Sequence, residues 1–273
     1  MKNFIILLIL SDAETENLVK RSYQYVALYN VNNKFALTQG GWNTLQMDTK
    51  LKDHTMTDIA RPNNDSFYSS ALFDLTGEPM ILYLPSFNSN YVSLMVTAYD
   101  HYVDLPKASR NGDFKEAEYI LFYSDRTQGY NGQEVEGVDN IYKTTGDYIS
   151  AVFRIMPHAA DPERFKDIVE EIGSIKIMTL SEFSGSEAIP VESVSFPDVG
   201  QTDMDVFENN LLEVMQFVFN HISFDTEDEL DQKLLEAYKP LGIEPGKEYS
   251  PDEVKIDGKK FRAVAEHPTR ISR

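Results

Sequence analysis

The chain has 273 residues, of which 42% are hydrophobic and 12% aromatic, enough to bury a substantial core. Asp and Glu number 44 against 25 Lys and Arg, so the formal net charge is −19, which repels phosphate backbones and argues against nucleic-acid binding. There is no cysteine, which excludes a thiol nucleophile, a disulfide framework and a cysteine-ligated zinc site.

Residues 1–11 allow two interpretations. Lys2 and the apolar run 4–10 resemble the front of a secretion signal, although no small-residue cleavage site follows. The alternative is a buried apolar segment. The run is too short to cross a bilayer and no other stretch is long enough, so we predict no membrane span. Taken alone, the N-terminus slightly favours a cytoplasmic protein over a secreted or periplasmic one.

A long helix is expected directly after this segment. Ser11 and Glu14 have the spacing of a capping box, in which each side chain bonds a backbone N–H of the other residue. An apolar stripe at helical spacing follows, and it predicts a helix over about 12–30. The stripe consists of Leu18, Val19, Tyr23, Tyr25, Val26 and Tyr29.

From residue 66 the pattern is typical of short strands separated by turns. Aromatic and branched residues alternate with clusters of Gly, Pro and Asn, a pattern of antiparallel sheets. The expected strands are 67–74, 80–84, 91–99, 119–123 and 148–156. Such strands favour a β-sandwich or a barrel.

Helices return in the last third of the chain. Asp161 and Pro162 predict a helix start, and Gly173 is expected to end that helix. Further on we expect a short strand at 175–180, a linker-like stretch at 181–202, a helix over 203–222 and another between the capping box at 226–229 and Pro240.

The predicted fold is therefore α+β. It is a mainly antiparallel β-sandwich or barrel, with an N-terminal helix and C-terminal helices packed beside it. We expect one domain over residues 12–250 and a polar tail over 251–273.

Residues 61–71 read RPNNDSFYSSA, a Pro-Asn-x-Asp-x-x-Tyr pattern that leads into a strand. Hairpin residues 73–79 and the strand ending in Tyr99-Asp100 follow, and 241–247 read LGIEPGK. These segments resemble the domain-of-unknown-function 1254 family. The resemblance implies a β-sandwich-like fold with a helical layer, frequent export from the cytoplasm and no settled reaction.

The chain also departs from that family's pattern. The family has Arg before a Tyr-Tyr-Ser strand, whereas this chain reads Asn-Tyr-Val-Ser at 90–93. Many relatives continue into a second β domain of the 1214 type, and this sequence ends at Arg273, too early to include it. We therefore expect a single domain of the 1254 type.

The turn at Asn63, Asn64 and Asp65 places three short polar side chains beside Tyr68. Oxygens of Asn63 and Asp65 could ligate a divalent cation. The same side chains could equally bond their own backbone and shape the turn without any ligand.

A second candidate lies where the third strand ends. His101 follows Asp100, and a His beside an acid can act as a general base or a metal ligand, although it can also be an ordinary surface residue. Arg61 and Arg154 lie on or beside apolar strands, and we expect each to pair with Asp65 or Asp100, as a structural ion pair or an anion clamp.

Two hypotheses of function follow. The first is a binding or interaction module of exported or surface type, in which Asn63, Asn64, Tyr68 and Arg154 contact a glycan or a protein. The alternative is a hydrolase dependent on a divalent metal, with Asp65, Asp100 and His101 as catalytic residues and Asn63 and Asp65 as metal ligands. A divalent cation is the one cofactor considered, and a homo-oligomer stays open.

Overall fold

A computed structural model describes residues 6–7, 9–53, 55, 63–190, 194–252 and 254–267. The chain divides into two compact units. The helical unit contains Met1–Phe35, Tyr99–His101 and Ser193–Arg273, and the sheet unit contains Ala36–Ala98 and Tyr102–Glu192. The segment 12–250 contributes to both units, and its expected status as one domain stays a prediction.

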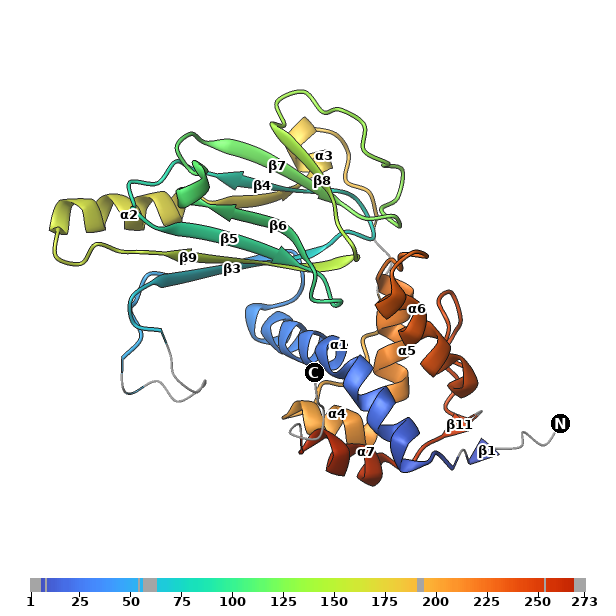
Figure 1. Ribbon diagram of the computed structural model, residues 1–273. Coiled ribbons are helices and arrows are strands. Elements are labelled where there is room, and N and C mark those ends of the chain that lie inside the picture. Colours follow the sequence, from blue (N-terminus) through green and yellow to red (C-terminus); the bar gives the residue numbers. More distant parts are fainter. Residues whose placement is uncertain are drawn as a thin grey trace. The chain divides into compact units, whose positions relative to one another are not determined.

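The sheet unit contains two sheets (Figure 1). The five-stranded sheet has the order β2-β3-β9-β5-β6 and is antiparallel throughout. The four-stranded sheet has the order β10-β4-β7-β8, in which only β7 and β8 run parallel. The strands are β2 (Thr44–Asp48), β3 (Phe67–Asp74), β4 (Met80–Leu84), β5 (Val92–Thr97), β6 (Val103–Ala108), β7 (Glu118–Tyr123), β8 (Asn140–Lys143), β9 (Tyr148–Ile155) and β10 (Lys176–Thr179).

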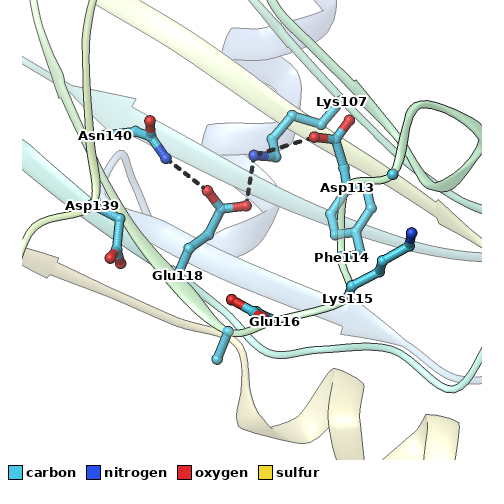
Figure 2. A pocket seen from close by; sticks show the side chains of 10 residues that line it. Lys107, Asp113, Phe114, Lys115, Glu116, Glu118, Asp139 and Asn140 are labelled. Atoms are coloured by element: carbon cyan, nitrogen blue, oxygen red, sulfur yellow. Dashed lines mark hydrogen bonds and ion pairs between the residues drawn. The ribbon is translucent and has the colours of Figure 1, made fainter.

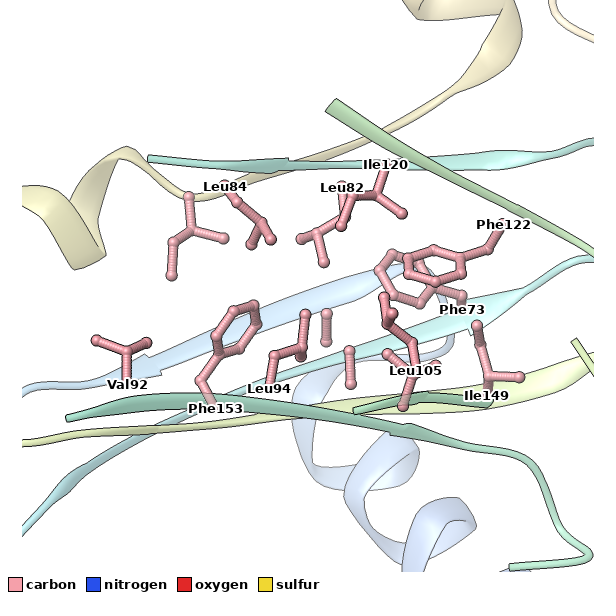
Figure 3. Close-up of a cluster of buried hydrophobic side chains, with 14 of the residues drawn as sticks. Phe73, Leu82, Leu84, Val92, Leu94, Leu105, Ile120, Phe122, Ile149 and Phe153 are labelled. Carbon is pink, nitrogen blue, oxygen red and sulfur yellow. The ribbon is translucent and has the colours of Figure 1, made fainter. Parts of the chain in front are cut away.

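One buried cluster joins the two sheets. Figure 3 shows Leu82, Ile120 and Phe122 of the four-stranded sheet pointing toward side chains of the five-stranded sheet such as Leu94 and Phe153. Because side chains alternate along a strand, every second residue of β9 enters this cluster and the others point to the opposite face of the sheet, where Tyr148 and Ser150 are buried and Arg154 is exposed. At the sheet margins β6 lies beside β8 and β10 beside β2.

Helix α2 (Pro162–Ser174) begins as the sequence predicts. The Asp161 side chain accepts a hydrogen bond from the Arg164 backbone N–H at 3.2 Å, and Pro162 occupies the first helical position. The helix does not end at Gly173, because this glycine lies within the last turn and Ile175 is the C-cap. The short helix α3 (Leu180–Ser184) is held by buried Glu78, which accepts bonds from the backbone and the hydroxyl of Ser181.

The helical unit is built around aromatic contacts of helix α1 (Asp12–Gln39), whose C-terminal end belongs to the sheet unit. The ring of Tyr29 lies 5.4 Å from that of Tyr99 and 5.6 Å from that of Phe217. The other elements are β1 (Ile6–Leu7), α4 (Asp203–Asn209), α5 (Leu211–His221), α6 (Glu229–Tyr238), η2 (Lys239–Leu241), β11 (Val254–Lys255) and α7 (Gly258–Ala265). Within the sheet unit, η1 (Ser109–Asn111) follows β6.

The predicted helix over 203–222 is two helices, α4 and α5. They are separated by Asn210, whose backbone φ of −148° is not helical and whose side chain donates to the Asp198 carbonyl at 2.8 Å. Helices α4 and α7 are joined by Arg262, which binds Asp205 at 2.7 Å and Glu208 at 3.0 Å.

The structure confirms the α+β class, with two mostly antiparallel sheets and helices both before and after them in the chain. Strands β2, β6 and β8 were not predicted, because each is short and mixes polar with apolar residues. Within the described residues, no helix combines the length and the apolar character that a membrane crossing needs.

Replacing Phe153 with Ala should destabilise the sheet unit by about 4 kcal/mol, because Phe153 is fully buried between the sheets. Its neighbour Val152 faces outward and is half-buried, so Val152→Ala should cost about 1 kcal/mol. Chemical denaturation can be followed by fluorescence of Trp42, the only tryptophan, which packs against Tyr148. Equal losses of unfolding free energy in the two variants would contradict the placement of Phe153 in the core and of Val152 on the outer face.

Gly258→Ala should loosen helix α7 from α4. A Cβ at Gly258 would lie 1.8 Å from the carbonyl oxygen of Glu208, so the two helices would have to separate, at a cost of about 3 kcal/mol. Faster amide hydrogen exchange in both helices would show this. Gly173→Ala is the matched control, since a Cβ there meets no atom within 4 Å, and it should stabilise by about 0.5 kcal/mol.

Candidate functional site

The predicted polar turn is formed by its own side chains. The Asn63 side-chain oxygen accepts the backbone N–H of Asp65 at 2.8 Å, as the turn interpretation expects. Asn63, Asn64 and Asp65 are all exposed at the start of β3. Arg61, the neighbouring cation, lies outside the described residues.

Tyr68 and Arg154 lie together on the outer face of the five-stranded sheet. They are directly paired in the register of β3 and β9, and the guanidinium carbon lies 5.8 Å from the centre of the Tyr68 ring. The predicted pairing of Arg154 with Asp65 or Asp100 is wrong, because Arg154 forms no ion pair with any residue that the structure describes. Its guanidinium is exposed beside the aromatic ring.

Exposed apolar side chains extend this pair into a larger surface. Tyr91 is adjacent to Met156, Ser93 pairs with Arg154, and Met95 pairs with Val152. Tyr91, Met95 and Met156 are 39%, 38% and 37% exposed. The outer-face patch is defined here as Tyr68, Tyr91, Met95, Arg154 and Met156.

The other predicted catalytic pair belongs to the helical unit. The backbone carbonyl of Asp100 accepts the Gln24 side chain at 2.9 Å, and Asp100 is buried. His101 is exposed with a positive backbone φ of 69°. Asp65 belongs to the sheet unit, so the structure does not bring Asp65 together with Asp100 and His101 within one unit.

The predicted metal site is not found among the described residues. They contain no group of three or more His, Asp or Glu side chains arranged to hold an ion. The suggested ligands Asn63 and Asp65 form the turn described above, and Asp65 alone of the two offers a carboxylate.

A pocket that sequence reasoning missed opens where β6, β7 and β8 begin or end, with a volume of about 430 Å³ (Figure 2). The connection between β6 and β7 forms one wall. Gly112 turns it with a φ of 96°, and the Asp113 side chain accepts the Ala108 backbone N–H at 2.8 Å. Buried Phe114 anchors it by accepting the Phe87 N–H at 3.0 Å through its carbonyl.

A chain of charged and polar contacts lines this pocket. The Lys107 ammonium lies 2.6 Å from Glu118 and 3.6 Å from Asp113. Dashed lines mark both contacts in Figure 2. The second oxygen of Glu118 accepts the Asn140 side-chain amide at 2.9 Å. Asp139 accepts the backbone N–H of Tyr119 at 2.7 Å.

No sequence motif indicated this pocket, because its residues come from three separate segments. Their spacing along the chain fits no metal or nucleotide signature. The available signal was the concentration of charge in DFKEAE at 113–118, which leads directly into the apolar strand β7.

One solved structure supports this fold. The structure is similar to that of the VPA0106 protein from Vibrio parahaemolyticus, with a TM-score of 0.64 and 20% identity, over 94% of this chain and 58% of that one. The chain thus spans little more than half of that relative's length. A putative uncharacterized protein from Burkholderia cenocepacia matches with a TM-score of 0.30 and 11% identity, over 59% of this chain and 52% of that one. No curated protein is significantly similar in sequence.

The family model that matches covers residues 42–177, which include both the outer-face patch and the pocket. It confirms the resemblance drawn from the segment 61–100, and the chain belongs, through residues 42–177, to the family described as "Protein of unknown function (DUF1254)".

Proposed function

We propose that the sheet unit is a protein-interaction module and that the outer-face patch is its contact surface. The observation that carries the proposal is the pair of half-buried Tyr68 and exposed Arg154, which lies on the sheet beside Tyr91, Met95 and Met156. Asn63 and Asn64, at the exposed turn before β3, are proposed to border the surface.

The composition of the patch supports a protein partner over a glycan. Its five members are Tyr, Met and Arg, the residue types that are enriched at the centres of protein interfaces, whereas Lys and Glu are depleted there. Methionine side chains adapt their shape to an apolar partner and offer no hydrogen-bond donor to a sugar hydroxyl.

The charge of the patch specifies the partner further. Arg154 carries the patch's only formal charge and has no ion-pair partner among the described residues, in a chain where acids outnumber bases. A carboxylate flanked by apolar side chains complements it. Two copies of a chain with a net charge of −19 repel each other, which favours a different protein over a second copy.

The alternative of a metal-dependent hydrolase gains no support from the geometry. Its candidate residues Asp65 and Asp100 belong to different units, and the described part of the chain offers no cage of ligands. We therefore keep the binding module as the proposed function.

A displayed library of random peptides tests the proposal. Peptides selected on the wild-type protein should carry an acidic residue beside apolar ones. Arg154→Gln should weaken the binding of a selected peptide 10- to 100-fold in fluorescence polarisation, because a hydrogen bond to a charged group contributes about 1.5–3 kcal/mol. Replacing the peptide's acid with its amide should weaken binding to the wild type but not to Arg154→Gln.

Lys166→Gln provides the matched control. It removes an exposed cation from α2 of the same unit, and binding should be unchanged. Peptides that bind Arg154→Gln as tightly as the wild type would refute the proposed surface. A dimer in sedimentation velocity that Arg154→Glu dissociates would assign the patch to a second copy and overturn the choice of a different protein.

A further inference from the structure

We propose that the pocket between the β6–β7 connection and the start of β8 binds a small organic diamine through its two ammonium groups. The pocket is independent of the outer-face patch, since none of its lining residues belongs to the patch. Its volume of about 430 Å³ lies in the range of small-molecule sites.

The pocket wall already holds one ammonium group. The Lys107 side chain is only 10% exposed, and its Nζ is placed between Glu118 and Asp113 at 2.6 and 3.6 Å. Each oxygen of Glu118 already has one partner, since the second oxygen accepts the Asn140 amide. The wall is therefore pre-organised around a primary ammonium, and its internal charge is largely neutralised.

Two further carboxylates that line the pocket, Glu116 and Asp139, have oxygens available to accept hydrogen bonds from a ligand. Glu116 is exposed and forms no hydrogen bond or ion pair with any described residue. Asp139 uses one oxygen for the Tyr119 N–H, and its other oxygen has no described partner. The charged lining residues are two lysines and four acids, a net charge of −2, which matches a dication.

Other ligand classes fit this lining less well. An anion would meet four carboxylates. A sugar ring would lack a stacking surface, because Phe114, the only aromatic residue of the lining, is 4% exposed. A bare divalent metal needs six or more oxygen ligands, and no three acidic side chains among the described residues converge as a cage. An ammonium group needs only two or three acceptors.

The probe is 1,4-diaminobutane, compared with 1,4-butanediol as its uncharged counterpart. Calorimetric titration of the full chain should show binding of the diamine and none of the diol. The double variant Glu116→Gln, Asp139→Asn should bind the diamine with an affinity at least 10-fold lower than that of the wild type. Asn at 139 keeps a side-chain oxygen for the Tyr119 N–H, so the fold should be retained. Glu170→Gln, which removes an exposed acid from α2, should leave the affinity unchanged.

Three outcomes would overturn the proposal. The first is diamine binding that is equal in the wild type and in the double variant, which would indicate attraction to the acidic surface in general. The second is diol binding as tight as diamine binding. The third is displacement of the diamine by equimolar Mg²⁺, which would make the pocket a metal site.

Discussion

The rest of the sheet unit depends on the central position of strand β9. It pairs with β3 on one side and β5 on the other, so its inward residues anchor the cluster that joins both sheets. Its outward residues lie in register with Tyr68 and Ser93, which fixes where Arg154 stands. The alternation of side chains thus makes the buried core and the exposed patch two consequences of one backbone arrangement.

The pocket depends on a different constraint, the shape of a connection rather than of a strand. Between Gly112 and Glu118 the chain is held by Phe114 inside the core and by Asp113 on the backbone of β6. These anchors fix the backbone that carries the charged side chains, which would lower the entropic cost of binding the proposed ligand. A loop is suited to this role because it can place charges at the rim of a core without burying them.

The two proposed sites use the charge of the chain in opposite ways. The outer-face patch presents a lone guanidinium on an aromatic and methionine surface, whereas the pocket concentrates acids around a lysine. Both lie within the segment that matches the family, and they can be tested separately because they share no residue. The helical unit is stabilised by its own aromatic contacts and by Arg262 between α4 and α7.

The sequence by itself determined the α+β class, the main strands around 67–99 and 148–156, and the start of α2, since alternation, capping residues and Pro are local signals. It also placed Asn63 in a turn, because Asn bonds its own backbone. Only the tertiary structure decided that Arg154 contacts Tyr68 instead of an acid, that Asn210 divides a helix, and that Lys107, Glu118 and Asn140 meet. Those contacts join residues far apart in the chain, and their partners are selected by strand register and packing, which no local pattern encodes.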